Sequence, residues 1–238
     1  MRRVKLVAAD IDGTLTISRD TYLLDLDAIK MIRVLEENDI RVSLVSGNSI
    51  LIVAGLARYL GAKGPSIGEN GCIVYYRGVI HRLCSSETRQ AAELVKEELG
   101  LTPSWQNPYR EYDLAFVKKG SSKEELRKLV TQASQILERH GYRNLKVVSS
   151  GYALHVMPRE ADKGQGLLYA CKLLGISPSE VVAIGDSETD LELFEKAGIS
   201  VAVSNADEKA KEKADIVLSK PSGKGFVELA ELILSGKI

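Results

Sequence analysis

Four aspartates follow two apolar runs of the chain, at positions where their carboxylates could meet. Asp10 and Asp12 come directly after the apolar residues 4–9, and Asp186 follows a second such run. Asp190 lies four residues beyond Asp186, so both side chains can face the same way once a helix starts. A single aspartate after a strand is usually a turn or helix-capping residue. The four together predict one acidic site.

Carboxylates gathered in this way repel one another, and burial raises their pKa values unless a cation neutralises them. A hard divalent ion is the natural partner for such oxygen ligands. We expect Mg²⁺ rather than Ca²⁺, because Mg²⁺ is commonly held by a few carboxylates together with water and substrate phosphate oxygens, and the sequence has no EF-hand loop. Such an ion would also let a phosphate dianion approach an acidic site.

Donors for phosphate oxygens are predicted at the ends of the same strands. Ser46 follows the apolar residues 41–45 and offers a hydroxyl, while backbone N–H groups after Asp10 and at Gly47 could complete the contact. Asn205 follows another predicted strand and could support the site. Each of these residues is also an ordinary turn residue, and the two interpretations stay open here.

Strands alternate with helices in both outer parts of the chain, which is typical of a doubly wound parallel sheet. The expected strands and hairpin are residues 4–9, 41–45, 73–81, 181–184, 199–203 and 216–218. The expected helices between and after them include residues 49–60, 163–174, 188–197 and 225–234. We therefore predict an α/β fold with a Rossmann-like core.

The pattern changes in the middle of the chain. Helical periodicity and strands there occur in the order helix, strand, helix, strand, strand, at residues 87–99, 114–117, 122–139, 145–148 and 153–157. The short gap between the last two strands favours antiparallel pairing, so we predict an α+β insert. The expected boundaries are residues 83–156 for the insert and residues 1–82 with 157–238 for the core.

Composition excludes several classes of function. The 238 residues include 32 Lys and Arg against 32 Asp and Glu, so the formal net charge is zero and nonspecific binding to nucleic acid or anionic membranes is disfavoured. No apolar run approaches the ~18–20 residues that span a bilayer, and Asp10 interrupts the first run too early for a signal sequence. We expect a cytoplasmic monomer or homodimer without nucleic-acid or membrane partners.

The cysteines and histidines show no metal-ligand spacing. Cys72, Cys84 and Cys171 lie far apart, with no C-x-x-C and no nearby histidine pair, so we expect buried, reduced thiols rather than a disulfide framework. The three histidines are equally scattered, and we expect surface or hydrogen-bonded core positions for them.

The aspartate motif resembles that of a known enzyme family. Asp10-Ile11-Asp12-Gly13-Thr14 is similar to the D-x-D-G-T signature of the haloacid dehalogenase superfamily of phosphohydrolases. Ser46, Lys163 and the segment from Gly185-Asp186 to Asp190 follow in the order of that family's later motifs. The insert resembles the C2B cap of the Cof-like branch. Ser46-Gly47-Asn48 and Gly68-Glu69-Asn70-Gly71 look most like the archaeal-type phosphoglycolate phosphatases.

The resemblance implies a role for each aspartate. Asp10 would be the nucleophile that takes the phosphoryl group as an aspartyl phosphate. Asp12 would protonate the leaving alkoxide and then activate water. Mg²⁺ would be bound by Asp10, by the backbone carbonyl of Asp12 and by Asp186, with Asp190 as a direct ligand or as support for the ligands.

The resemblance also implies the phosphate contacts. Thr14 and Ser46 would hold phosphate oxygens, and Lys163 would neutralise the phosphate and pair with Asp10. Taken without the motif order, a lysine at a helix start is usually solvated. Thr189 departs from the family pattern, because Cof-like proteins often carry Asn there. A contact from the side chain at that position is therefore left open.

The implied activity is Mg²⁺-dependent hydrolysis of a small phosphorylated metabolite, with 2-phosphoglycolate giving glycolate and phosphate. Arg110 and Arg143 in the insert could bind a substrate carboxylate, or could be solvated surface residues. The alternatives are a sugar-phosphate phosphatase, a phosphomutase of the same superfamily, or a non-catalytic phosphate-binding module. The presence of both Asp10 and Asp12 argues against the last, because a binding protein needs neither a nucleophile nor an acid.

Overall fold

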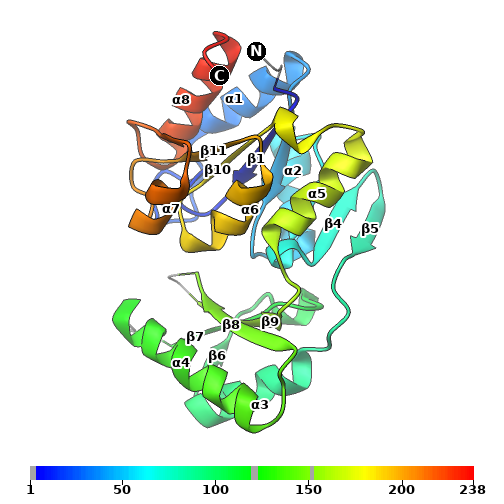
Figure 1. Cartoon of the computed structure of the whole chain (residues 1–238), viewed down its shortest axis with the longest axis vertical. Helices are drawn as coiled ribbons and strands as arrows, with labels where there is room; N and C mark the ends of the chain where they lie inside the picture. The colour runs from blue at the N-terminus through cyan, green and yellow to red at the C-terminus, as the bar shows by residue number, and fades with distance from the viewer. Residues whose placement is uncertain (1–3, 119–122, 151–152) are drawn as a thin grey trace.

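The first apolar run forms β1 (Leu6–Asp10), which is buried along its whole length at the centre of an eight-stranded sheet. The computed structural model describes residues 4–118, 123–150 and 153–238 (Figure 1). The sheet runs in the order β12-β11-β10-β1-β2-β3-β4-β5. Its other strands are β2 (Arg41–Val45), β3 (Ser66–Gly68), β4 (Ile73–Tyr76), β5 (Val79–Arg82), β10 (Val181–Gly185), β11 (Ile199–Ala202) and β12 (Ile216–Val217).

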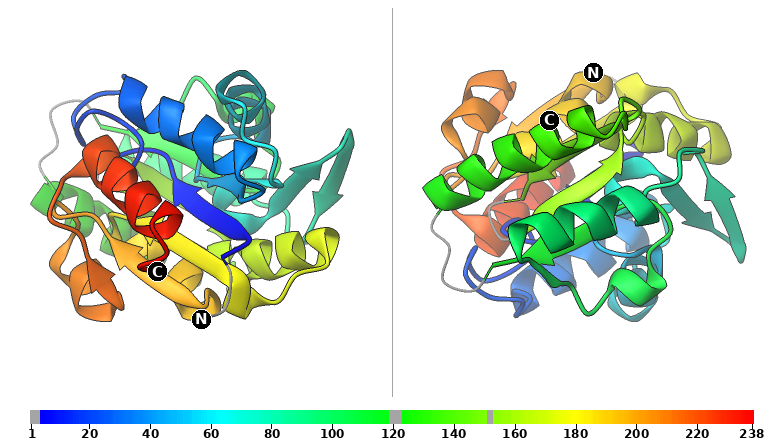
Figure 2. Two further views of the ribbon diagram at one scale, coloured as in Figure 1. Left: turned by 90° about the horizontal axis from the view of Figure 1, so that it is seen from above. Right: turned by 90° about the horizontal axis from the view of Figure 1, so that it is seen from below.

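Parallel pairing dominates this sheet, as expected for a doubly wound fold. The neighbours from β12 to β3 are all parallel. The pairs β3–β4 and β4–β5 are antiparallel, and the second of them is the predicted hairpin. The helices are α1 (Leu26–Glu37), α2 (Ile50–Leu60), α5 (Lys163–Leu174), α6 (Leu191–Lys196), α7 (Glu208–Lys213) and α8 (Ser222–Leu234). In Figure 2, α1 and α8 lie together on one face of the sheet and α5 on the other. The predicted α/β fold class is confirmed.

The middle of the chain builds a second sheet with its own hydrophobic core, below the first sheet in Figure 1. Its four strands follow the order β6-β7-β9-β8 and all pair in antiparallel fashion. The elements are α3 (Arg89–Leu99), β6 (Thr102–Pro103), β7 (Leu114–Val117), α4 (Lys123–Arg139), β8 (Leu145–Ser149) and β9 (Leu154–Pro158). The predicted pairing of the last two strands is confirmed. Residue 122, where we expected the second helix to start, lies outside the described residues.

The expected helix over residues 188–197 is divided. A 3₁₀ turn covers Glu188–Asp190, and α6 follows at Leu191. The Ser187 and Asp190 side chains form a capping box at the start of this turn, in which the Asp190 carboxylate accepts the backbone N–H of Ser187. Among the described residues, we find no helix long and apolar enough to cross a membrane.

The expectation of three reduced cysteines is wrong for two of them. Cys72 and Cys84 form a disulfide, with Cα atoms 5.0 Å apart, and Cys171 is a buried free thiol. The hairpin brings the pair together, because β4 and β5 pair Ile73 with Arg82 and place residue 72 beside the chain that leaves β5. The disulfide therefore ties the start of β4 to the segment that leads into α3.

Reduction of this disulfide should lower stability. The bond closes a short loop, with a sequence separation of 12 residues, and loops of this size contribute roughly 3 kcal/mol by restricting the unfolded chain. We expect reductant to lower the midpoint of thermal unfolding of the wild type and to leave a Cys72→Ser/Cys84→Ser variant unchanged. Titration of the denatured, unreduced protein should find one free thiol, Cys171. Three free thiols would contradict the disulfide.

Candidate active site

The predicted acidic site forms at the carboxyl ends of three neighbouring strands. Asp10 ends β1, Ser46 follows β2 and Asp186 follows β10, and these strands are adjacent and parallel. Asp10, Asp186 and Asp190 are all buried and offer oxygen atoms within 4.8 Å of one another. The ends of β1 and β10, with the turn that follows β10, therefore bring three of the four predicted aspartates together.

Two glycines allow the loops to come this close. Gly13 has φ +88°, and a Cβ there would lie 2.3 Å from Asp186 Oδ2, so a side chain is excluded by both conformation and space. At Gly185, a Cβ would lie 2.6 Å from the carboxyl group of Asp190. The two glycines thus permit the approach of the Asp12 loop to Asp186 and of β10 to Asp190.

Lys163 reaches the carboxylates from the first residue of α5. Its Nζ donates to Asp10 Oδ1 at 2.9 Å and to Asp190 Oδ1 at 2.6 Å, and the side chain is 3% exposed. Burial disfavours the ammonium, but the charges of Asp10 and Asp190 more than offset this and raise the pKa of Lys163 above its ordinary value. Lys163 is therefore a permanent cation at the acidic site, in the place that the resemblance implied.

The carboxylates nevertheless lack sufficient positive charge. Burial, followed by the charge of Asp190, raises the pKa of Asp10 well above its ordinary value. The same two causes raise the pKa of Asp186 to about 7, and burial also raises the pKa of Asp12. Desolvation and the charge of Asp190 outweigh the contribution of Lys163 at Asp10 and of Arg19 at Asp186, and desolvation outweighs that of Asn48 at Asp12, so a further cation nearby would favour the ionised forms.

Both carboxylate oxygens of Asp190 accept hydrogen bonds from other groups of the protein. Oδ1 accepts from Lys163, and Oδ2 accepts the backbone N–H groups of Asp186 at 3.1 Å and of Ser187 at 3.0 Å. The hydroxyl of Ser187 also donates to Oδ2, and it pairs with Thr189 Oγ1 at 2.7 Å. These contacts favour a supporting role, in which Asp190 holds the Asp186 loop and Lys163 in place.

Asp186 has a cationic neighbour that the sequence reasoning missed. Arg19 pairs through Nε with Asp186 Oδ2, donates through Nη2 to the Asp186 carbonyl at 2.7 Å, and donates through Nη1 to Asp207 Oδ1 at 2.8 Å. Arg19 lies in the irregular segment between β1 and α1, where no periodicity or spacing marks it. It holds the Asp186 side chain through these contacts.

Asp12 and Ser46 share a neighbour, Asn48, for which the sequence predicted no function. Asn48 Nδ2 donates to Asp12 Oδ2 and to Ser46 Oγ, both at 2.9 Å, and the Asn48 backbone N–H donates to Ser46 Oγ at 3.0 Å. Thr14 is fully buried, and its Oγ1 has no hydrogen-bond partner among the described residues. Asn205 exchanges two hydrogen bonds with Ser222 at the start of α8. Its predicted role in substrate binding stays a prediction.

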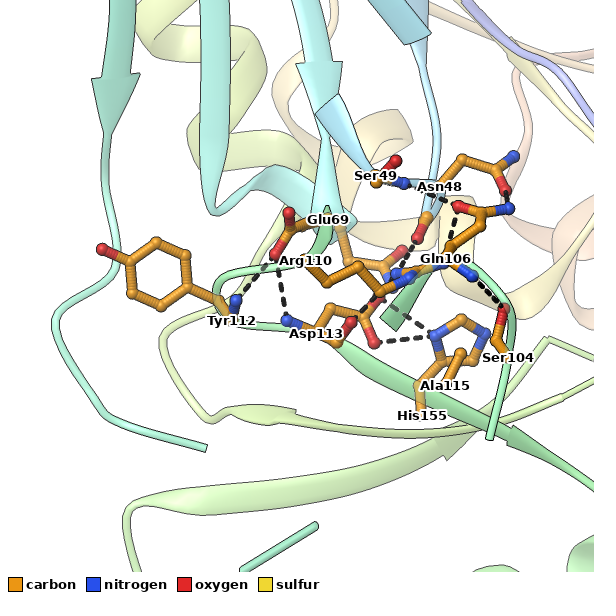
Figure 3. Close-up of polar contacts among 12 residues, drawn as sticks. Asn48, Ser49, Glu69, Ser104, Gln106, Arg110, Tyr112, Asp113, Ala115 and His155 are labelled. Carbon is orange, nitrogen blue, oxygen red and sulfur yellow. Dashed lines mark hydrogen bonds and ion pairs between the residues drawn. The ribbon is translucent and has the colours of Figure 1, made fainter. Parts of the chain in front are cut away.

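The two candidate arginines of the insert lie in different surroundings. Arg143 is exposed, whereas Arg110 is 4% exposed and donates through Nη1 to the carbonyl of Gly47 at 2.7 Å. Glu69 accepts the backbone N–H groups of residues 111–113, which are next in the chain. Figure 3 shows how these contacts fasten the insert loop to the loops after β2 and β3. Arg110 is thus part of the junction between the two sheets.

A cleft of about 420 Å³ lies between the two sheets. The eight-stranded part contributes Arg19, Asn70 and Thr189, and the insert contributes Lys146 and Ser150 among others. The cleft therefore adjoins the buried cluster of carboxylates through Arg19, which pairs with Asp186. A small ligand bound there would be enclosed by both parts of the chain.

Comparison with known proteins agrees with this geometry. A family model described as haloacid dehalogenase-like hydrolase matches residues 7–101 and 112–229. "Phosphoglycolate phosphatase 1" of Saccharolobus solfataricus is 42% identical over 234 residues, covering 98% of this chain and 97% of that protein. "Phosphoglycolate phosphatase" of Metallosphaera sedula is 41% identical over 232 residues, covering 98% of this chain and 100% of that protein.

Solved structures share the fold over nearly the whole chain. A crystal structure of a Thermoplasma acidophilum protein superposes with a TM-score of 0.82 at 27% identity, covering 98% of this chain and 99% of that one. A haloacid dehalogenase-like hydrolase from Bacteroides thetaiotaomicron gives 0.77 at 22% identity, covering 97% and 100%. Both sheets and their connections are therefore common to these proteins.

Proposed function

The chain belongs to the haloacid dehalogenase-like hydrolase family, and from this premise we propose that it hydrolyses 2-phosphoglycolate to glycolate and phosphate. The relatives at about 40% identity support phosphatase activity through their names. The observation that carries the proposal is the buried Asp10 carboxylate, paired with Lys163 at the end of the central strand. Such an arrangement provides a nucleophile together with a cation for the phosphate.

In the first step, an oxygen of the Asp10 carboxylate attacks phosphorus. The bond from phosphorus to the alkyl oxygen breaks, and Asp12 donates its proton to the leaving alkoxide. Asp12 suits this role because burial raises the pKa of its carboxyl group, which favours the protonated form. Lys163 and Ser46 hold the phosphoryl oxygens during transfer, since Lys163 Nζ donates to Asp10 and Ser46 Oγ accepts from the same Asn48 amide that donates to Asp12.

In the second step, water attacks the phosphorus of the aspartyl phosphate. Asp12 now accepts the proton from water, and the bond between phosphorus and the Asp10 oxygen breaks. Phosphate leaves and the Asp10 carboxylate is restored. The same carboxyl group thus serves as acid and then as base, which requires Asp12 to stay within reach of both the alkyl oxygen and the incoming water.

The residues present fit a hard divalent ion. Three buried carboxylates offer oxygen atoms within 4.8 Å of one another, and the raised pKa values of Asp10 and Asp186 show that a cation here would stabilise their ionised forms. We propose that Asp10, Asp186 and the backbone carbonyl of Asp12 would hold Mg²⁺, with Asp190 supporting them. When bound, the ion neutralises the carboxylates and polarises the phosphoryl group.

Removal of the metal should abolish turnover. A chelator is expected to lower phosphate release to background, because dianionic phosphate would then face carboxylates without sufficient positive charge. Excess Mg²⁺ should restore the rate, and Ca²⁺ should restore much less of it. Full activity in chelator, after exhaustive dialysis, would contradict the proposed metal site.

We propose that residues 83–156 act as a cap that closes the cleft, excludes water and selects a short substrate.

A panel of phosphate esters tests the identity of the substrate. We expect the highest kcat/KM for 2-phosphoglycolate and lower values for sugar phosphates. Strong activity on sugar phosphates alone would replace the substrate and keep the chemistry. Interconversion of sugar-phosphate isomers without phosphate release would indicate a phosphomutase.

A further inference from the structure

A chain of hydrogen bonds leads from the insert to Asp12. Gln106 lies between β6 and the 3₁₀ turn Asn107–Tyr109, and its Nε2 donates to Asn48 Oδ1 at 2.7 Å (Figure 3). Asn48 Nδ2 in turn donates to Asp12 Oδ2 and to Ser46 Oγ. The insert therefore reaches Asp12 through two amide side chains.

The donor-to-acceptor direction of these hydrogen bonds is fixed by two groups that can only donate. Arg110 Nη2 lies 3.2 Å from Gln106 Oε1, and the backbone N–H of Ser49 donates to the same oxygen at 3.0 Å. Because neither a guanidinium nor a backbone N–H can accept, Oε1 of Gln106 must face them. Its NH₂ group then faces Asn48, whose Oδ1 accepts, and the NH₂ group of Asn48 is left facing Asp12.

Hydrogen bonds from Asn48 also determine the direction of the Ser46 hydroxyl hydrogen. Ser46 Oγ accepts from both the side chain and the backbone N–H of Asn48. A hydroxyl has two acceptor lone pairs and one O–H donor, so the hydrogen of Ser46 is directed to another acceptor. In the proposed reaction, that acceptor is a phosphoryl oxygen.

Arg110 is held by contacts that do not depend on substrate. Besides Gly47, its Nη1 donates to the carbonyl of Asp113 at 3.0 Å, and it pairs with Asp113 Oδ2 at 3.3 Å. Asp113 is fully buried, accepts from Asn70 Nδ2 at 2.8 Å, and lies 2.8 Å from Nδ1 of His155. The donor that orients Gln106 is thus anchored at the junction between the two sheets.

We propose that Gln106 is a positioning residue, which orients Asp12 through the side chain of Asn48 only while the insert is seated on the core. This inference rests on the proposed function, because it assigns Asp12 the role of acid. With the insert seated, Asn48 presents N–H groups to both catalytic side chains. When the insert lifts, Asn48 loses the donor that fixes its amide and Asp12 loses its fixed orientation, whereas Ser46 keeps the backbone N–H of Asn48 as a donor.

The Gln106→Glu variant tests the proposal. A carboxylate of the same size can still accept from Arg110 and Ser49, but it cannot donate to Asn48 Oδ1. A misplaced Asp12 matters for an alkoxide leaving group, which needs a proton, and little for p-nitrophenolate. We expect kcat/KM to fall about 10- to 100-fold for 2-phosphoglycolate and at most about 3-fold for p-nitrophenyl phosphate.

Two further variants make the test decisive. Gln106→Leu also removes the donor without adding charge, and it should show the same difference between substrates. Gln132→Glu makes the same chemical change on the exposed face of α4 and should leave both substrates unchanged. The midpoint of thermal unfolding is measured for each variant to separate loss of fold from loss of orientation.

Equal losses on both substrates, or no loss on either, in a folded Gln106 variant would overturn the proposal. The proposed function fails in a different way. If the wild type hydrolyses neither 2-phosphoglycolate nor p-nitrophenyl phosphate, the phosphatase assignment is wrong before any variant is compared. A wild type that is active on both, with Gln106 variants that do not discriminate, would reject only the positioning role.

Discussion

The Asp10→Asn variant is expected to lose phosphate release by a factor on the order of 10⁴ or more, because an amide cannot attack phosphorus and the covalent route has no substitute nucleophile. Steady-state hydrolysis of 2-phosphoglycolate and of p-nitrophenyl phosphate should both fall, since both require the same attack. The exposed Asp20, in the loop that follows, provides a matched control. Asp20→Asn should retain the wild-type rate.

The Asp10→Asn substitution should not lower stability, although it removes activity. Burial and the charge of Asp190 raise the pKa of Asp10, so this group lowers the stability of the folded protein as pH rises from the ordinary pKa to the raised one, and the cost stays constant above it. A neutral amide removes that cost. We therefore expect the midpoint of thermal unfolding of Asp10→Asn at neutral pH to equal or exceed that of the wild type. An inactive variant that is also unfolded would not support a catalytic role for Asp10.

The Asp12→Asn variant is expected to lose about 10²- to 10⁴-fold in kcat, the usual contribution of a general acid and base. The loss has two parts, because Asn cannot protonate the alkoxide and cannot accept a proton from water. With p-nitrophenyl phosphate the first requirement is relieved. Aspartyl phosphate should then form readily and accumulate, because its hydrolysis still needs the base. Rapid-quench measurement should show a burst of p-nitrophenol followed by slow turnover.

Two results would contradict the role of Asp12. One is wild-type turnover of 2-phosphoglycolate by Asp12→Asn. The other is an equal loss on both substrates with no burst, which would place Asp12 outside proton transfer. Asp20→Asn serves again as the control, since it makes the same substitution in the same loop without a catalytic effect.

The sequence predicted the part of the site that depends on topology. Because parallel strands bring their carboxyl ends to one edge, the positions of Asp10, Ser46 and Asp186 after apolar runs were enough to place them together. Lys163 was found through the order of motifs and not through its own surroundings. Its contacts with Asp10 and Asp190 depend on where α5 begins, which the Asp162 cap determines.

The register of the predicted hairpin could have indicated the disulfide. The expected hairpin already paired residues 73–76 with 79–81, and extending that register by one step puts residue 72 opposite residue 83. Cys84 is the next residue along. The spacing between the cysteines carried no motif, so the pairing required the register of the strands and not the sequence separation.

The contacts of Arg19, Gln106 and Arg110 could not be predicted in the same way. All three lie in segments without helical or strand periodicity, and their partners are far away in the sequence. The orientation of such loops is decided by buried polar groups such as Asp113. Only the packed structure shows which donors and acceptors remain for the active site.

The most direct test of the account is to identify the covalent intermediate. Asp12→Asn is mixed with p-nitrophenyl phosphate and Mg²⁺, quenched in acid during the slow phase and digested, and the peptides are analysed by mass spectrometry. We predict one added phosphoryl group on the peptide that begins at the N-terminal strand, localised to Asp10 and absent from an Asp10→Asn/Asp12→Asn variant. Turnover with no phosphorylated peptide, or with the phosphoryl group on another residue, would contradict a mechanism in which Asp10 attacks phosphorus.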